Sequence, residues 1–237
     1  MTTLSPNPLV CIVTGANKGI GLAVTRALCS LSQSNLVYLT SRDRERGEQA
    51  VKTLQKEGLQ PKYHQLDIDD EKSVEALHDY MKDNHGGIDI LVNNAGIAFK
   101  NDSNAPFAEQ AQVTVETNFG GTRKVCRHLF PLLRQGARVV NVTSNCGHLS
   151  KIKGEEPADL GLRDRLSSED LTEEELVKMM EQFVKLAKEG EHVKSGWPNS
   201  AYKVSKVGVS ALTIIQQRVV DQERAGEDIV INHAHPG

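Results

Sequence analysis

Short apolar runs alternate with longer amphipathic segments along most of the chain. The runs are rich in β-branched residues and end at turn residues, which predicts strands that are buried on both faces. We place these strands at residues 9–13, 36–40, 63–66, 88–92, 138–143 and 229–232. The segments between them have apolar residues at helical spacing, which predicts helices at residues 19–31, 44–56, 71–84, 107–134 and 201–223.

This alternation of strands and helices predicts the fold class. Parallel strands joined by helices form right-handed crossovers, and the helices then cover both faces of the sheet. We therefore expect an α/β protein with a doubly wound parallel sheet of the Rossmann-like type. A chain of 237 residues fits one such domain, so we predict a single domain over residues 1–237.

Residues 151–198 interrupt the alternation, because they lie between the fifth strand and the last long helix and are rich in charge. They contain a helix of their own, in which Thr172 and Glu175 form a capping box and Gly190 supplies the stop. We interpret the insertion as a helical lid, although periodicity alone is equally compatible with an ordinary packed helix. The apolar stripe of this helix consists of Leu176, Met179, Met180, Phe183, Val184 and Ala187.

Charge and cysteine content narrow the class of partner. Lys and Arg number 28 against 31 for Asp and Glu, so the formal charge of -3 offers no attraction to nucleic acid or anionic lipid. No apolar stretch is long enough for a membrane span or a signal peptide. The four cysteines form no CxxC pair, which fits a reducing compartment. We expect a cytoplasmic protein that acts on a small molecule.

A glycine-rich turn, residues 14–21, follows the first strand and opens the first helix. Glycines let the backbone approach a pyrophosphate, and a helix N-terminus presents free N–H groups and the positive end of its dipole. The spacing differs from GxGxxG, so the turn matches the dinucleotide fingerprint only in kind. Any tight turn can contain glycines, but the position after the first strand favours a dinucleotide site. The residues that we assign to it are Gly15, Asn17, Lys18, Gly19, Ile20 and Gly21.

The end of the second strand predicts which dinucleotide binds. Thr40-Ser41-Arg42 has no acidic residue where an NAD site usually places one for the ribose 2′-hydroxyl. Arg42 and Lys18 can instead neutralise a 2′-phosphate, which favours NADP(H). The alternative is that both are solvated surface cations. Asp43 follows directly, and we interpret it as the start of the next helix.

Tyr202 and Lys206 give the strongest local signal for catalysis, since four residues on a helix place both on one face. A nearby ammonium favours the phenolate, which makes a tyrosine a usable acid near neutral pH. Such a pair by itself is more often a surface contact. Ser144, however, follows the fifth strand at the carboxyl edge of the sheet, where open α/β folds bind ligands. Together these residues predict hydride transfer from the cofactor to a carbonyl.

These motifs occur in a characteristic order: Thr14-Gly15…Gly19-Ile20-Gly21, Asn93-Asn94-Ala95-Gly96, Asn118, Ser144 and Tyr202…Lys206. In this order the chain resembles the short-chain dehydrogenase/reductase family, from about residue 9 to residue 237. The residues around Asp67, Phe99 and Trp197 resemble the monomeric NADPH carbonyl reductases of that family. The resemblance implies reduction of ketones, aldehydes and quinones to alcohols by a monomer, whose insertion covers the helical surface used elsewhere for oligomerisation.

The resemblance also implies residue roles. It makes Tyr202 the proton donor, Lys206 the activator of Tyr202 and a ribose ligand, Ser144 the group that orients the carbonyl, and Asn118 the holder of a proton-relay water. It implies that Phe99 and Gln110 line the substrate pocket with Ser144 and Tyr202. The other cofactor contacts that it implies are Asp67, Ile68, Asn94, Ala95, Gly96, Pro236 and Gly237.

Departures from the family pattern define an alternative function. The family normally continues beyond Pro236-Gly237 through a nicotinamide-contacting loop, a helix and a strand, so the alternative is an NADPH-binding protein without turnover. An epimerase or dehydratase with the same Tyr and Lys is disfavoured by the glycine spacing. His235 stands where some carbonyl reductases have a cysteine of a glutathione site, which argues against that site here. His233 and His235 alternate on a strand without a third ligand, so we expect no metal.

Overall fold

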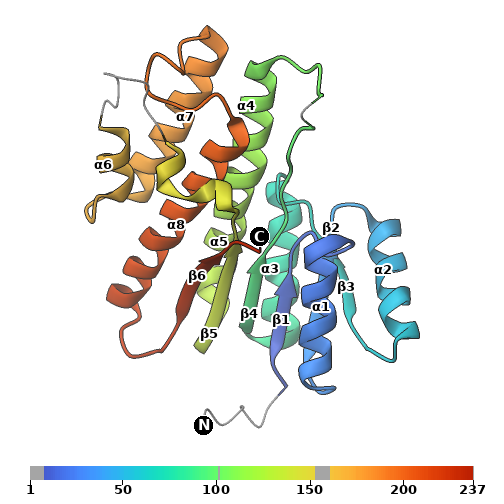
Figure 1. Ribbon diagram of the computed structural model, residues 1–237. Coiled ribbons are helices and arrows are strands. Elements are labelled where there is room, and N and C mark those ends of the chain that lie inside the picture. Colours follow the sequence, from blue (N-terminus) through green and yellow to red (C-terminus); the bar gives the residue numbers. More distant parts are fainter. Residues whose placement is uncertain (1–7, 101, 153–160, 237) are drawn as a thin grey trace. The chain divides into compact units, whose positions relative to one another are not determined.

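The computed structural model describes residues 8–100, 102–152 and 161–236 (Figure 1). The cofactor assignment of Gly237, residues 153–160 of the insertion and the first seven residues lie outside this description. The chain divides into two compact units. The first contains the chain up to Ala95, together with Lys124–Val140 and Arg224–Val230. The second contains Gly96–Arg123, Asn141–Glu223 and the chain from Ile231 onward. The single domain expected from length stays a prediction.

The strands of the described residues form a six-stranded sheet in the order β3-β2-β1-β4-β5-β6. The pairs β1–β2, β1–β4 and β2–β3 are parallel. This strand order is that of a doubly wound sheet, which confirms the predicted fold class. The strands are β1 (Val10–Val13), β2 (Leu36–Ser41), β3 (Lys62–Gln65), β4 (Ile88–Asn93), β5 (Leu133–Val142) and β6 (Val230–Ala234).

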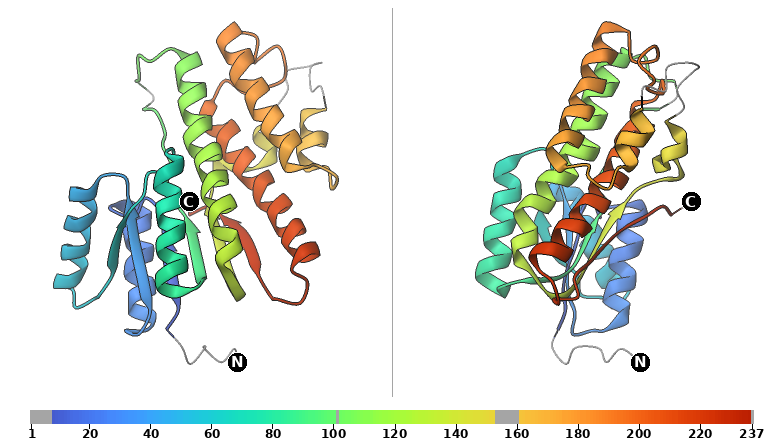
Figure 2. Two further views of the ribbon diagram at one scale, coloured as in Figure 1. Left: turned by 180° about the vertical axis from the view of Figure 1, so that it is seen from behind. Right: turned by 90° about the vertical axis from the view of Figure 1, so that its left-hand side faces the viewer.

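Helices connect these strands, and within the first unit α1 and α3 lie on opposite faces of the sheet (Figure 2). The bounds of α1, α2 and α8 are those predicted from the sequence. The α-helices are α1 (Gly19–Leu31), α2 (Arg44–Lys56), α3 (Glu71–His85), α4 (Phe107–Val115), α5 (Thr122–Leu129), α6 (Leu162–Ser167), α7 (Glu173–Glu189) and α8 (Ala201–Glu223). The other helical segments are the π-helix η1 (Glu116–Gly121) and the 3₁₀ turns η2 (Phe130–Leu132), η3 (Asn145–Gly147) and η4 (Leu149–Lys151).

The helix predicted over residues 107–134 is wrong in two respects. The segment consists of α4, the π-helix η1 and α5, and it ends in the 3₁₀ turn η2. Pro131 stands in that turn, where its missing N–H and its ring stop an α-helix. Residues 133–134 then belong to β5, which begins five residues before the predicted start. The sequence signal was obscured because Gly136, inside this strand, has a positive φ of 78° and reads as a turn residue.

Burial of the strands follows their place in the sheet. Every residue of β1 is buried, and β2 is buried from Val37 onward, as the apolar runs predicted. The prediction of two buried faces is wrong for β3, where Lys62 and Gln65 are exposed, and for β6, where Asn232 is exposed. The reason is that β3 and β6 are the edge strands of the sheet, with a neighbour on one side only. The prediction is also wrong for β5, where Arg138 is exposed.

The insertion forms the predicted helix, α7, within the second unit. Thr172 Oγ1 accepts a hydrogen bond from Glu175 N at 3.2 Å, and the Glu175 carboxylate accepts one from Thr172 N at 3.0 Å, which confirms the capping box. Gly190 ends the helix in the left-handed conformation, with φ of 74°. The apolar stripe packs with α4 and α8, and Val184 is its only half-buried member among these described residues. Helix α6 was not predicted from the sequence, and the lid role of the insertion stays a prediction.

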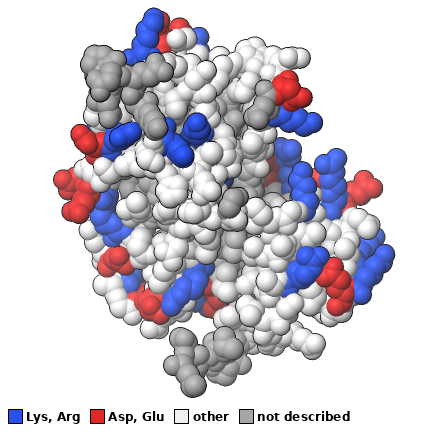
Figure 3. Space-filling view, in the orientation of Figure 1, with Lys and Arg blue, Asp and Glu red and all other residues white. Residues whose placement is uncertain are grey.

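Three properties concern the surface, the helices and the cysteines. In the face shown in Figure 3, basic and acidic side chains lie close to one another. Across residues 8–100, 102–152 and 161–236, every helix is too short or too polar to cross a bilayer. All four cysteines are free, and three of them are buried.

The close approach of α2 to β3 gives a stability prediction. A Cβ on Gly47 would lie 2.1 Å from Tyr63 Cε2 and 2.4 Å from Ser41 Oγ. We expect Gly47→Ala to lower the free energy of unfolding by about 1–3 kcal/mol, because the added methyl forces Tyr63 out of place. Urea denaturation measures the change.

Gly120→Ala is the matched control for this substitution. Its Cβ would meet only Val115 O, at 3.9 Å, so we expect a change of less than about 1 kcal/mol. Equal unfolding free energies for the Gly47→Ala variant and the unmodified protein would contradict the packing argument.

Candidate active site

The side chains expected to carry chemistry lie in the second unit. Asn118 is in the π-helix η1, and Ser144 directly follows β5. Tyr202 and Lys206 occupy the first two turns of α8. Each of the four residues therefore lies in a helix or next to the end of one.

Asn118 connects three segments of the second unit. The residue is 1% exposed, and its side-chain amide makes three hydrogen bonds. Oδ1 accepts a hydrogen bond from Ile97 N at 2.7 Å, while Nδ2 donates to Ile97 O at 2.9 Å and to Ser205 Oγ at 3.0 Å. The π-helix places this residue, and π-turns are frequent at functional sites. The π-helix was not predicted from the sequence, because this segment continues the α-helical pattern on both sides.

Lys206 has a buried amine. The residue is 7% exposed, and Nζ donates a hydrogen bond to Val142 O at 2.9 Å. Because burial penalises the charged form, the pKa of Lys206 falls from 10.5 to about 8. Nζ lies 5.8 Å from the centre of the Tyr202 ring. The structure thus brings together the two side chains that the sequence placed on one helix face.

Gly96 allows the backbone to come close to the same groups. A Cβ at this position would lie 3.0 Å from Asn118 Oδ1 and 3.6 Å from Lys206 Nζ. A side chain here would enter the space between the amide and the amine. Gly96, Asn118 and Lys206 therefore form one continuous polar cluster.

Ser144 is held in a tight turn beside α8. Its Oγ accepts a hydrogen bond from Cys146 N at 3.2 Å, so the residue caps the 3₁₀ turn η3. A Cβ on Gly147, in the same turn, would lie 3.0 Å from Lys206 O and 3.1 Å from Ser210 Oγ. This close contact fixes the turn against α8, and Ser144 remains half-buried with its hydroxyl hydrogen free to donate.

The glycine turn of the first unit is fastened to the end of β4. Thr14 Oγ1 accepts hydrogen bonds from Asn94 N at 3.0 Å and from Ala95 N at 2.9 Å. Asn94 Nδ2 donates in return to Thr14 O at 2.9 Å and to Gly15 O at 3.1 Å. A Cβ on Gly15 would lie 2.7 Å from Ala95 Cα, and one on Gly21 would lie 2.5 Å from Asn94 Nδ2. These two glycines are required by packing inside the protein.

The start of α1 is open to solvent. Lys18 and Gly19 are exposed, Asn17 is half-buried, and Ile20 is 47% exposed. A Cβ on Gly19 would meet nothing within 4 Å, so its φ of 56° is the reason for glycine there. The exposed N-terminus of α1 could hold an anionic group such as a phosphate.

Arg42 is exposed, and its guanidinium makes no hydrogen bond or ion pair with the described residues. Its neighbours are engaged: Arg44 pairs with Glu48 at 2.8 Å, and Arg46 with Asp43 at 3.2 Å. Asp43 also accepts a hydrogen bond from Arg46 N at 3.0 Å and caps α2, as the sequence predicted. Arg42 is therefore available to an external anion.

The remaining predicted contacts have structural partners of their own. Asp67 Oδ1 accepts a hydrogen bond from Asp69 N at 3.1 Å, and Ile68 is buried. Gln110 Nε2 donates to Ala105 O at 2.8 Å and so fixes the turn before α4. Phe99 is half-buried and Pro236 is exposed. The ligand contacts of Asp67, Ile68, Phe99, Gln110 and Pro236 stay predictions.

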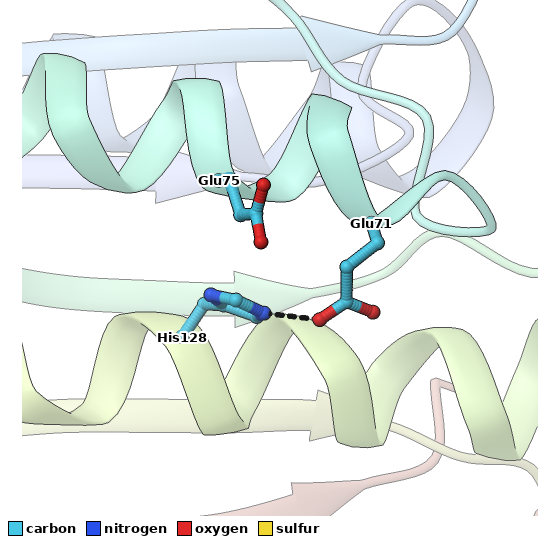
Figure 4. A group of neighbouring side chains, drawn as sticks. All are labelled: Glu71, Glu75 and His128. Atoms are coloured by element: carbon cyan, nitrogen blue, oxygen red, sulfur yellow. Dashed lines mark hydrogen bonds and ion pairs between the residues drawn. The ribbon is translucent and has the colours of Figure 1, made fainter.

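Figure 4 shows a cluster that the sequence analysis missed, in which Glu71 and Glu75 of α3 face His128 of α5. His128 Nε2 lies 2.6 Å from Glu71 Oε1, and this hydrogen bond lowers the pKa of Glu71. Arg127 and Lys124 lie 3.5 Å and 3.9 Å from the same carboxylate. The positive charges of Arg127 and Lys124 would repel a metal ion at this carboxylate. We therefore interpret the cluster as an ion-pair network that joins α3 to α5. No sequence signal connects Glu71 with a residue 57 positions away.

The strand order, the anchored glycine turn, the polar cluster of Gly96, Asn118 and Lys206, and the Tyr202–Lys206 pair define a class: dinucleotide-dependent oxidoreductases with a doubly wound sheet. The family model described as short chain dehydrogenase matches residues 9–155. The chain belongs to this family.

Relatives and solved structures agree with this assignment. The NADPH carbonyl reductase 1 of Mus musculus is 48% identical over 99% of this chain and 83% of its own length. The NADPH carbonyl reductase 1 of Homo sapiens is 49% identical over 96% and 80%, respectively. Among solved structures, menthone neomenthol reductase from Mentha piperita is 32% identical with a TM-score of 0.81, covering 97% of this chain and 89% of the other. Salutaridine reductase from Papaver somniferum is 30% identical with a TM-score of 0.82, covering 97% and 86%.

The lowered pKa of Lys206 gives a prediction about stability and pH. The unfolded chain binds a proton on this amine up to about pH 10.5, whereas the folded protein releases it near pH 8. Stability should therefore rise with pH between these values, by up to about 3 kcal/mol, and level off above them. The quantity to measure is the difference in unfolding free energy between the unmodified protein and Lys206→Met, from pH 7 to pH 10.5.

Lys203→Met is the matched variant, because it removes a neighbouring lysine of the same helix that is only half-buried. This variant should follow the pH profile of the unmodified protein. A difference between the unmodified protein and Lys206→Met that stays constant over this range would contradict the buried, titrating amine.

Proposed function

We propose that this protein reduces carbonyl compounds, namely ketones, aldehydes and quinones, to alcohols with NADPH as the hydride donor. The observation that carries the proposal is the buried ammonium of Lys206, 5.8 Å from the ring centre of Tyr202 on the same helix. The NADPH carbonyl reductases that share about half of its residues support the same activity. NADPH, when bound, supplies the hydride that adds to the carbonyl carbon.

Tyr202 supplies the proton in this proposal. As the carbonyl oxygen gains negative charge, the Tyr202 hydroxyl transfers its proton to that oxygen, and the products are the alcohol and NADP⁺. The Lys206 ammonium stabilises the negative charge that develops on the phenol oxygen. The hydrogen bond from Nζ to Val142 O keeps the amine in place during this step.

Ser144 and Asn118 position the reacting groups. The Ser144 hydroxyl donates a hydrogen bond to the carbonyl oxygen, and its capped turn holds it at a fixed distance from α8. Asn118 fixes the backbone at Ile97 and the hydroxyl of Ser205. We assign to this arrangement the relay water that returns a proton to Tyr202.

The NADPH contacts that we propose are those expected from the sequence. The N-terminus of α1, with Gly15, Asn17, Gly19, Ile20 and Gly21, takes the pyrophosphate, and Lys18 and Arg42 take the 2′-phosphate. The unpaired guanidinium of Arg42 supports this choice of dinucleotide. The adenine, the riboses and the nicotinamide are assigned to Asp67, Ile68, Asn94, Ala95, Gly96, Tyr202, Lys206 and Pro236.

We also propose that the protein is a cytoplasmic monomer. Packing of α7 along α4 in the second unit supports the monomer, because it covers a helical face that could otherwise bind a second chain. The four free cysteines support a reducing compartment. The small-molecule substrate is consistent with the mixed charges of the surface.

Tyr202→Phe tests the acid role. We expect turnover to fall by about 10²–10⁴-fold, because the phenol proton is lost, while NADPH still binds with unchanged Kd. Oxidation of NADPH is followed by absorbance with menadione, isatin and an aromatic aldehyde as substrates, and binding by fluorescence titration.

Tyr80→Phe is the control, since Tyr80 lies in the first unit with its hydroxyl 3.3 Å from that of Tyr38. Near-normal turnover of Tyr202→Phe would reject the acid role. NADPH binding by the unmodified protein without oxidation of any substrate would favour the binding protein without turnover.

Arg42→Asp tests the choice of dinucleotide. Loss of a charge-assisted contact to the 2′-phosphate should reduce the preference for NADPH over NADH by about 10–100-fold in Kd. Calorimetry with both dinucleotides measures this ratio, so the result does not depend on turnover. Arg44→Asp, which removes a neighbouring arginine paired to Glu48, should leave the ratio unchanged; an equal effect of both substitutions would show only a general charge effect.

A further inference from the structure

The second unit contains a groove between α7 and the continuous helix formed by α4, η1 and α5. The two helices are joined at both ends. Arg123 Nε donates to Glu173 Oε1 at 2.6 Å at one end, and the rings of Phe107 and His192 stack at 4.4 Å at the other. Glu173 begins α7 and pairs with Arg123, whereas His192 follows α7 and stacks on Phe107, the first residue of α4, so the two helices run antiparallel. Between the ties lies a groove of about 500 Å³.

The size and floor of this groove are typical of a small-molecule site. Its volume is within the range of known ligand pockets, roughly 300–1,000 Å³. Val115, Phe119 and Met180 form a buried apolar floor, and Val177 and Val184 are half-buried walls. The groove is lined entirely by residues of the second unit.

Gly120 keeps the groove open. A Cβ at this position would meet only Val115 O, at 3.9 Å, so the glycine is not required by packing against another element. Any side chain here would extend into the groove. The π-helix adds to the opening, because its wider turn displaces the following residues from the regular α-helical positions.

The charged residues at the rim of the groove determine which polar group a bound ligand can carry. Lys185 and Lys188, on the last turns of α7, are exposed and make no ion pair with any described residue. Arg123 at the opposite end is already neutralised by Glu173. Glu116 and Glu181 also line the groove and are exposed, which disfavours a second negative charge on the occupant.

We propose that this groove binds a small amphipathic monocarboxylate. Its apolar chain lies on Val115, Phe119 and Met180, and its carboxylate pairs with Lys185 and Lys188. The ligand stays on the surface of the second unit and needs neither NADPH nor the carbonyl substrate.

The floor of the groove also touches the elements that carry the polar cluster. Phe119 directly follows Asn118 in η1. A Cβ on Gly208 would lie 2.8 Å from Met180 Sδ and 3.2 Å from Phe119 Cδ2, and Gly208 is two residues after Lys206 on α8. An occupant that displaces Phe119 or Met180 therefore presses on η1 and α8. The effect on turnover, unlike the binding itself, rests on the proposed function.

Binding is tested by calorimetric titration with decanoate, using decan-1-ol as the neutral probe of similar length. We expect decanoate to bind saturably at a single site, and we expect Gly120→Leu to abolish this binding. The double variant Lys185→Glu with Lys188→Glu should raise the Kd for decanoate about 10-fold or more. Decan-1-ol should bind more weakly and be insensitive to the double charge reversal. Val184→Trp is a second filling variant, needed if Gly120→Leu proves unstable by circular dichroism.

Lys178→Glu with Lys52→Glu is the matched control, because it makes the same change in net charge at two exposed lysines outside the groove. The groove is rejected if decanoate does not bind, or if its Kd is unaffected by the filling variants. Equal weakening by both lysine pairs would reject specific pairing with Lys185 and Lys188.

Turnover measurements separate this inference from the proposed function. Decanoate should change kcat for menadione reduction in the unmodified protein and have no effect in Gly120→Leu. Groove-dependent binding in a protein without turnover would leave the groove site standing and overturn the reductase. Turnover of menadione in a protein that shows no groove-dependent binding of decanoate would overturn the groove site and leave the reductase standing.

Discussion

Burial of one ammonium group constrains the chemistry of the second unit. A lysine amine in a protein interior is stable only when its N–H groups find acceptors, and Val142 O supplies one for Lys206. The same burial lowers the pKa to about 8, so the group keeps its charge at neutral pH but responds strongly to its surroundings. A Cβ on Gly96 would lie 3.6 Å from this amine, and the capped turn of Ser144 contacts its helix through Gly147. Little space is therefore left for a larger side chain at Gly96 or Gly147.

Regular elements with clear ends could be predicted from the sequence. The bounds of α1, α2 and α8 follow from apolar periodicity and end residues, and α7 has its capping box and its terminal glycine as expected. The start of β5 could not be found, because Gly136 looks like a turn residue inside a strand. The π-helix η1 was also missed, since its sequence continues the α-helical pattern on both sides.

In the candidate site, only the contacts between residues that are close together in the sequence could be predicted. Tyr202 and Lys206 are four residues apart on one helix, so helix geometry alone brings them together. The partners of Asn118 could not be deduced, because Ile97 and Ser205 lie 21 and 87 residues away. The glycines show a further limit. The sequence assigned Gly15 and Gly21 to phosphate binding, whereas the structure shows that packing against Ala95 and Asn94 already demands them.

The hydrogen bonds between Thr14-Gly15 and the Asn94-Ala95 segment have a thermodynamic consequence. Four of them hold the turn in its final shape, with donors and acceptors satisfied inside the protein. A loop that is already rigid loses little conformational entropy when it captures a ligand, so more of the interaction energy appears as affinity. A glycine turn that is already in its final conformation also favours fast association, because no slow rearrangement has to precede binding of the ligand.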